Sequence, residues 1–404
     1  MATLINQEQL KVLVYSANSN IGGVQIWCFS YFRYLLENNV PATLFIGQSG
    51  DLVEDLSEFH RSQLIVGDLA TLFTYLSNNH IDILHVPSQS IDEGLGFVKI
   101  LFPRIKIVVT CHGSIPIGWS TNNCDQIISC APWLTNAASS IVGHEIPYIF
   151  NGVNSQNFYY EEDNIATIKP IILWVGRVND TVKCFKSFIA AIPQIKDLGF
   201  DIWVATSVKK SDCVYNIDVE IDEWFSSNYF DMPKLYRTVS NSGGALLMTS
   251  IREGLPLTAI EAQACGCPLI GPCHTGIKDA AINKNFLYES NEIDDMLNKI
   301  KQLLQKKDYK TKAELSKAAL NHFDMHNMTL NYFNLYKANK APLKSNIIGQ
   351  LKRKFLQIKY ENLSFRLGIF KNISNTINDL DNLDLCSKLY KRKYIYLLFN
   401  FYKR

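Results

Sequence analysis

Short apolar runs rich in valine and isoleucine alternate along the chain with longer stretches whose apolar residues recur at helical spacing. Runs that are apolar almost throughout are typical of parallel strands that helices cover on both faces. Strands are therefore predicted at Val12–Ser16, Ala42–Ile46, Ile83–Val86, Ile107–Thr110, Ile171–Val175, Ile202–Ala205 and Ala245–Thr249. Alternation of strands and helices builds right-handed βαβ units, so the pattern predicts an α/β protein.

The strand–loop–helix layout occurs twice. The strand at 12–16 leads through Gly22-Gly23 into a helix, and the strand at 171–175 leads through Gly176-Arg177 into another. A chain of 404 residues is long enough for more than one core. We therefore expect a first Rossmann-like domain over residues 1–160, a second over 161–340, and a helical tail over 341–404.

Charge sets this tail apart from the rest of the chain. The net charge of the whole chain is only +2, which does not favour nucleic-acid binding. Residues 341–404 nevertheless contain 13 basic and 4 acidic residues, among apolar residues at helical spacing. A basic amphipathic segment can lie on an anionic membrane surface. The alternative is that the tail packs on the first domain or on a partner.

Composition favours a globular protein in a reducing compartment. The apolar fraction is 47% and the charged fraction 19%, and ten cysteines are scattered without a pairing pattern. No run reaches the roughly 18 apolar residues of a membrane span, and the first residues show no signal-peptide pattern. The expected location is the cytoplasm, with peripheral contact at the inner face of the membrane through the tail.

Two glutamates follow the strand predicted at 245–249. Glu253 lies in the loop after the strand, and Glu261 lies in the second turn of the helix that starts near Pro256. Ligands of doubly wound sheets bind beyond the carboxyl ends of the strands, where the amides of Gly254 and Leu255 also lie. Carboxylates accept several hydrogen bonds and suit a polyhydroxylated ligand. The alternative is an ordinary helix N-terminus with charged residues.

Two cations follow the first strand of the second half. Arg177 comes at the end of that strand, and Lys183 lies near the start of the next helix. Alone, they are equally typical of a charged surface. Together with the two glutamates, they indicate a diphosphate site beside a helix N-terminus. Nearby Lys186 is expected to be solvated.

The first half offers two further candidates. Gly22 and Gly23 precede a helix and allow close approach of a phosphate, although they equally fit a tight turn between strand and helix. His112 follows the strand predicted at 107–110, where it is either a hydrogen-bonding partner of a sugar or a structural histidine. No metal site is expected, because the spacing of Cys265, Cys267 and Cys273 matches no common zinc site.

The stretch from Ser250 to Ala262, followed by Gly266-Cys267-Pro268, resembles the retaining glycosyltransferases of the GT-B fold, in particular glycosyltransferase family 4 (glycosyl transferases group 1). The resemblance covers about 12–338. It implies two Rossmann-like domains facing a cleft. It also implies catalytic roles for Arg177, Lys183, Glu253 and His112, and donor-binding roles for Gly22, Gly23, Gly254, Leu255 and Glu261.

In this family pattern, Glu253 and the amides after it hold the donor sugar, and Glu261 binds the ribose hydroxyls. The implied activity is retaining, metal-independent transfer of a sugar from a nucleotide diphosphate to a glycan or lipid-linked acceptor, in cell-surface polysaccharide or lipopolysaccharide synthesis. No cofactor is implied besides the donor. The alternatives are an inactive nucleotide-sugar-binding or scaffold protein of this fold, or another GT-B enzyme such as an epimerase.

The sequence departs from the family pattern at two loops. Cys184 follows Lys183 where the pattern has glycine. In the loop expected near the donor, Thr275 replaces a glycine, Lys278 a proline and Asp279 a glutamate. These departures leave the identity of the donor open.

Overall fold

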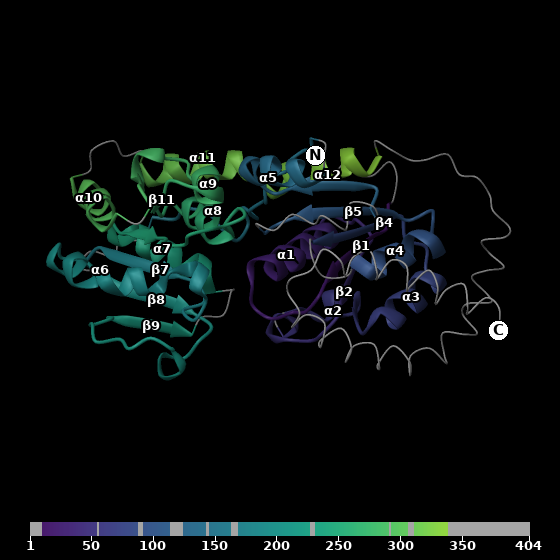
Figure 1. Ribbon diagram of the computed structural model, residues 1–404, viewed down its shortest axis with the longest axis horizontal. Helices are drawn as coiled ribbons and strands as arrows, with labels where there is room; N and C mark the ends of the chain where they lie inside the picture. Colours follow the sequence, from purple (N-terminus) through teal and green to yellow (C-terminus); the bar gives the residue numbers. More distant parts are fainter. Residues whose placement is uncertain are drawn as a thin grey trace. The chain divides into compact units, whose positions relative to one another are not determined.

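The computed structural model describes residues 10–54, 56–87, 92–113, 124–142, 145–162, 169–226, 231–290, 292–305 and 311–337. The chain divides between Met1–Lys344 and Ser345–Arg404, and all described residues lie in the first of these units. The first unit contains two parallel sheets of six strands each (Figure 1). The basic tail predicted at 341–404 lies outside the described residues.

The first sheet has the strand order β3-β2-β1-β4-β5-β6, and every neighbouring pair is parallel. This is the order of a doubly wound sheet, in which the chain reverses direction between β1 and β4. Its strands are β1 (Val12–Ser16), β2 (Ala42–Ile46), β3 (Leu64–Val66), β4 (Ile83–Pro87), β5 (Lys106–Cys111) and β6 (Gln126–Ser129). Its helices are α1 (Gly23–Glu37), α2 (Glu58–Arg61), α3 (Leu69–Asn78), α4 (Asp92–Leu101) and α5 (Pro132–Val142).

The second sheet repeats this topology, with the order β12-β11-β10-β7-β8-β9 and its reversal between β7 and β10. Its strands are β7 (Ile171–Val175), β8 (Asp201–Thr206), β9 (Glu223–Ser226), β10 (Ala245–Leu247), β11 (Leu269–Pro272) and β12 (Leu287–Tyr288). The helices that follow in the chain are α6 (Phe185–Asp197), α7 (Met232–Ser242), α8 (Leu257–Ala264), α9 (Thr275–Ala280), α10 (Ile293–Leu304), α11 (Lys312–His322) and α12 (Met325–Lys337).

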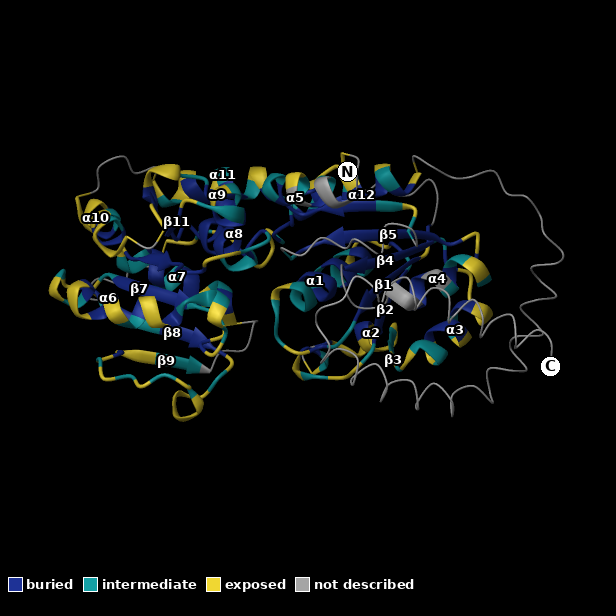
Figure 2. Ribbon diagram, viewed as in Figure 1, coloured by how far each residue is buried: buried dark blue, intermediate teal, exposed yellow. Residues whose placement is uncertain are grey.

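The central strands are buried on both faces, which explains their continuous apolar runs (Figure 2). All five residues of β1 are buried, and so are all five of β4. Helices cover the sheets and turn their polar faces outward. The prediction of an α/β protein with two doubly wound parallel-sheet domains is therefore confirmed.

Element boundaries differ from the predictions in places. The strand predicted at 245–249 ends at Leu247. The helix expected to start near Pro256 is α8, and Pro256 is its N-cap residue.

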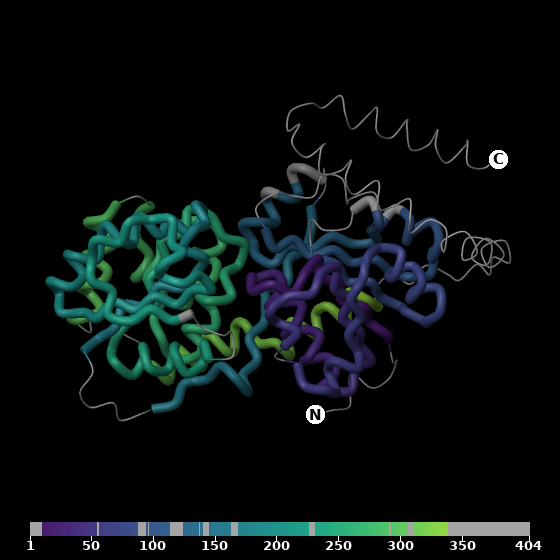
Figure 3. The backbone as a smooth tube through the Cα atoms, turned by 90° about the horizontal axis from the view of Figure 1, so that it is seen from below, coloured from purple at the N-terminus to yellow at the C-terminus, as the bar shows by residue number. Residues whose placement is uncertain are grey.

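Two chain segments run side by side at the crossing between the domains (Figure 3). Val153 donates its N–H to the Phe323 carbonyl at 2.7 Å, and Met325 donates to the Val153 carbonyl at 3.2 Å. A Cβ on Gly152 would lie 2.5 Å from Met325 Cα, so only glycine fits there. After this crossing, α12 packs its buried side chains into the core of the first sheet. The domain boundaries at 160 and 340 stay predictions. The range predicted for the second domain contains α12, although this helix packs against the first sheet.

Candidate functional site

Four loops that follow strand ends carry the predicted site residues. Arg177 follows β7 and Glu253 lies in the loop after β10, and these two strands are neighbours at the reversal point of the second sheet. In the first sheet, Gly22 follows β1 and His112 follows β5. The carboxyl ends of strands at such a point form the usual ligand crevice of the fold.

These loops line one cavity of about 470 Å³, which is within the size range of small-molecule sites. All nine predicted residues border it, from the first domain Gly22, Gly23 and His112, and from the second Arg177, Lys183, Glu253, Gly254, Leu255 and Glu261. The structure therefore brings the predicted site residues together. Their individual roles stay predictions.

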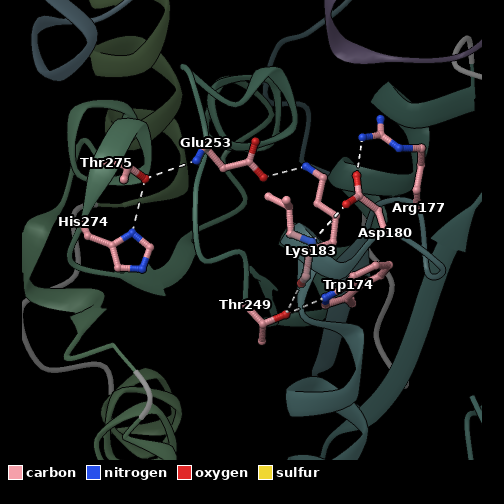
Figure 4. Close-up of polar contacts among 9 residues, drawn as sticks. Trp174, Arg177, Asp180, Lys183, Thr249, Glu253, His274 and Thr275 are labelled. Atoms are coloured by element: carbon pink, nitrogen blue, oxygen red, sulfur yellow. Dashed lines mark hydrogen bonds and ion pairs between the residues drawn. The ribbon is translucent and has the colours of Figure 1, made fainter. Parts of the chain in front are cut away.

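The most direct contact in the cavity joins an acid and a base. Lys183 Nζ donates to Glu253 Oε1 at 2.6 Å, and the two side chains are only 16% and 13% exposed (Figure 4). Lys183 ends the short 3-10 helix Thr181–Lys183, whereas Glu253 comes from the loop before α8. Each charge of this pair thus has a counterion of opposite sign in the cavity lining.

Buried hydrogen bonds fix the backbone that carries Lys183. The Thr249 hydroxyl donates to the Lys183 carbonyl at 2.8 Å and accepts from Trp174 Nε1 at 3.0 Å (Figure 4). Trp174 itself is 1% exposed in the core of the second domain. The position of the lysine is thus tied to the sheet.

Arg177 is held by a neighbour in the same loop. Its guanidinium pairs with the Asp180 carboxylate, which also accepts from the N–H of Val182 at 3.0 Å (Figure 4). Burial acts to raise the pKa of Asp180, but the hydrogen bonds from Val182 and Arg177 and the arginine's charge outweigh it and lower that pKa. Asp180 therefore stays ionised and orients a half-exposed arginine at the cavity edge.

The backbone of Glu253 is supported from the start of α9. Its N–H donates to Thr275 Oγ1 at 3.2 Å (Figure 4). Its carbonyl accepts from the Gly276 N–H at 3.2 Å. Thr275 has a φ of +48°, a left-handed conformation that is rare for a β-branched residue. Such strain commonly occurs at functional sites.

His112 is buried against the first-domain core, with its ring centroid 4.6 Å from that of Trp27. Burial lowers the pKa of His112 to about 3, so the imidazole is neutral near pH 7. A neutral ring both donates and accepts hydrogen bonds, which suits a hydroxyl partner.

The glycine pair begins α1 at the opposite wall. Gly22 is the N-cap residue, and within the described part of the chain no side chain caps this helix end or places an acid in its first turn. A Cβ on Gly22 would lie 2.6 Å from Gln25 Oε1 and 4.0 Å from Arg177 Nη1, whereas one on Gly23 would meet no described atom within 4 Å. N–H groups at a helix start without a side-chain cap, near an arginine, suit an anion.

The remaining predicted residues belong to α8 and the loop before it. Glu261 is 4% exposed and borders the cavity from the second turn of the helix. Gly254 touches the first domain, because a Cβ there would lie 1.9 Å from the His112 carbonyl oxygen. The Leu255 amide lies beside the buried Cys130 thiol.

Sequence reasoning missed the residues that support the site. Asp180, Thr249 and Trp133 carry no motif of their own, and their importance comes from the partners that the fold gives them. Asp180 had a detectable signal, since an acid three residues after Arg177 at the start of a helical turn is a typical N-cap.

Two findings concern the described residues as a whole. Among them, no group of three or more histidine, cysteine, aspartate or glutamate side chains is arranged to hold a metal ion. No helix among them is long and apolar enough to cross a membrane.

Comparisons with known proteins agree with this geometry. Residues 155–322 match the family model described as Glycosyl transferases group 1. A comparison with curated proteins gives no match.

Several solved structures share the fold. Sucrose-phosphate synthase from Thermosynechococcus elongatus has a TM-score of 0.67 at 16% identity, over 81% of this chain and 98% of that one. HepE from Anabaena, solved with UDP and glucose, has a TM-score of 0.65 at 14% identity, over 82% and 100%. An alpha-glucosyltransferase in complex with UDP and DNA has a TM-score of 0.58 at 15% identity, over 81% and 100%. At these identities, the likeness establishes the GT-B fold.

Residues 155–322 thus form a glycosyl transferases group 1 domain, and the protein is a glycosyltransferase of the GT-B fold.

Proposed function

We propose that the protein transfers a sugar, with retention of anomeric configuration and without a metal, from a nucleotide diphosphate donor to a glycan or lipid-linked acceptor. The observation that carries this proposal is the convergence of Arg177, Lys183, Glu253 and Glu261 on one cavity. This set provides cations for a diphosphate and carboxylates for hydroxyl groups. UDP-sugars are the first donors to test, because two of the similar structures contain UDP.

The lining of the cavity suggests one orientation for the donor in this proposal. The diphosphate lies between Arg177, Lys183 and the start of α1, whose N–H groups carry partial positive charge. The ribose hydroxyls bind the Glu261 carboxylate, and the sugar lies near Glu253, the Gly254 amide and His112. Lys183 forms an ion pair with Glu253, so binding of the diphosphate requires this lysine to form a second ion pair with a phosphate oxygen.

Transfer breaks the bond between the anomeric carbon and the diphosphate oxygen, and it forms a bond from that carbon to the acceptor oxygen. Negative charge grows on the departing diphosphate, and fixed cations that meet it are worth about 3–4 kcal/mol each in other enzymes. The acceptor attacks on the face that the diphosphate leaves, and a diphosphate oxygen takes the acceptor proton. Closure of the cleft excludes water and limits hydrolysis of the donor.

We place this reaction in the synthesis of a cell-surface polysaccharide or lipopolysaccharide, at the cytoplasmic face of the membrane. The support is the basic composition of residues 341–404, which fits an anionic surface where lipid-linked acceptors are found. Co-sedimentation with anionic vesicles, with and without residues 341–404, tests this part. Equal pelleting of both forms would remove it.

The donor proposal is tested by substituting two residues that border the cavity. Glu261→Ala and Arg177→Ala should each reduce transfer by about 10²-fold or more while the fold is kept. Lys186→Ala is the matched control, because this exposed lysine lies three residues from Lys183 and outside the cavity lining. A thermal-shift screen of UDP-, GDP- and ADP-sugars identifies the donor beforehand.

Three outcomes would contradict the proposal. Near-normal transfer by both purified variants would show that the cavity residues do not bind the donor. Binding of nucleotide sugars without transfer or hydrolysis would indicate a scaffold protein, and release of free sugar regardless of acceptor would indicate an epimerase.

A further inference from the structure

Trp133 connects the first domain to the predicted donor loop. It lies in the first turn of α5, and its indole Nε1 donates to the Gly254 carbonyl at 2.6 Å. Its backbone N–H donates to Asp279 Oδ2 of α9 at 3.0 Å. Trp133, a residue of the first domain, thus contacts two segments of the second domain, which are the loop that contains Glu253 and the helix α9.

The Gly254 carbonyl is tightly enclosed where the indole reaches it. A Cβ added to Gly276 would lie 1.5 Å from the Gly254 oxygen and 3.0 Å from Trp133 Nε1. The bond between Trp133 and Gly254 therefore needs glycine at position 276. This close approach gives Gly276 a physical role beside Thr275, which replaces the other glycine of the family pattern.

The other polar groups of this loop are also held. Thr275 Oγ1 accepts from the Glu253 N–H, and Gly276 donates to the Glu253 carbonyl. Because the peptide unit is planar and trans, fixing the Glu253 carbonyl directs the Gly254 N–H to the opposite side. Fixing the Gly254 carbonyl in turn sets the plane of the next peptide. The indole completes the set of contacts that orient this loop.

We infer that Trp133 is a positioning residue for sugar transfer, which orients the Glu253–Leu255 loop through its indole N–H. This inference rests on the proposed function. The bond joins residues 121 positions apart, one in each domain. Trp133 also packs against the core cluster that contains Leu255 and Ile277 of the second domain, so the indole is held in place beside the loop.

Trp133→Phe removes the indole N–H and keeps an aromatic ring. A neutral hydrogen bond contributes about 1 kcal/mol, so kcat/KM for transfer should fall about 5- to 10-fold. The fall should lie mainly in kcat, and the ratio of donor hydrolysis to transfer should rise.

Trp224→Phe is the matched control. Trp224 lies on the edge strand β9, and its Nε1 donates to the Val208 carbonyl at 2.9 Å. Trp224 does not border the cavity. This variant should lose thermal stability to a similar extent, with kcat and the hydrolysis ratio unchanged. Equal effects of the two tryptophan substitutions on kcat would overturn the inference, because the effect would then be one of stability alone.

Hydrogen exchange gives a readout that needs no turnover. In the ligand-free protein, amides of residues 250–258 should exchange faster in Trp133→Phe than in the wild type, and Trp224→Phe should leave them unchanged. Unchanged exchange in Trp133→Phe overturns the inference even if transfer is observed. Faster exchange in a protein that transfers no sugar supports the positioning role and contradicts only the proposed function.

Discussion

Substitutions of Lys183 and Glu253 should have coupled effects on the stability of the protein, but the double variant should not recover activity. The pair is 2.6 Å long and nearly buried, with 16% and 13% of the side chains exposed. Removing one partner leaves the other charge poorly solvated and without its counterion. Fully buried pairs cost about 3–5 kcal/mol when broken in this way, whereas exposed pairs cost about 0–1 kcal/mol.

Because the exposure of this pair is intermediate, Lys183→Met should lower the free energy of unfolding by about 2 kcal/mol. Glu253→Gln should cost less, about 1 kcal/mol, because the amide oxygen still accepts from Lys183. In the double variant neither side chain is charged, so no charge is left without its counterion. The double variant should therefore be at least about 1 kcal/mol more stable than the sum of the single effects predicts.

Urea unfolding of the four proteins measures this coupling, and transfer assays on the same samples measure activity. Each single variant should lose about 10²-fold or more in transfer, and the double variant should not recover it, because the diphosphate still lacks its cation. Additive stability effects would refute the argument that burial couples the two charges. Recovery of transfer in the double variant would refute the functional assignment.

Three further predictions concern the backbone and the buried histidines. Cys184 has a φ of +50°, so Cys184→Gly should raise the unfolding free energy by about 1 kcal/mol, whereas Cys184→Ala should not; equal effects in urea unfolding would contradict this. Gly276→Ala should lower Tm and transfer together, because its Cβ would collide with the Gly254 oxygen, and a wild-type Tm would show that the loop adapts. Burial, and then the nearby His112, lower the pKa of His85 to about 3, so the unfolded state binds more protons below pH 6.5. Stability should therefore fall as pH drops from 6.5 toward 3, and His85→Asn should reduce this slope by up to about 1.4 kcal/mol per pH unit in urea unfolding. An unchanged slope in that variant would show that His85 does not resist protonation in the folded state.

Much of the fold could be predicted because the central strands are buried on both faces. β1, β4 and β7 consist almost entirely of apolar residues, so their positions follow from composition alone. The edge strand β3 is not fully buried, and its short run carries no comparable signal. β3 was missed for this reason, since solvent on one side removes the requirement for apolar residues. β11 and β12 are fully buried and were missed because their runs are short, with four and two residues.

The site could be predicted as a set of loops, because strand ends in this fold converge at the reversal point of the sheet. The placement of α12 against the first sheet could not, because sequence order assigns it to the second domain. Contacts such as Trp133 with Gly254 have no local pattern either. These contacts depend on how the two domains pack together, and no short stretch of the sequence indicates that packing.

The two departures from the family's glycines show what the fold imposes. Cys184 and Thr275 both stand where the pattern has glycine, and both keep a left-handed backbone, with φ of +50° and +48°. A non-glycine residue in such a conformation costs about 1–3 kcal/mol, and the hydrogen bond from the Glu253 N–H to Thr275 Oγ1 offsets only about 1 kcal/mol. The surrounding contacts therefore hold the path of each loop against the preference of its residue. The left-handed backbone is therefore present at both positions without glycine, and the departures from the family pattern lie in the side chains that these loops carry.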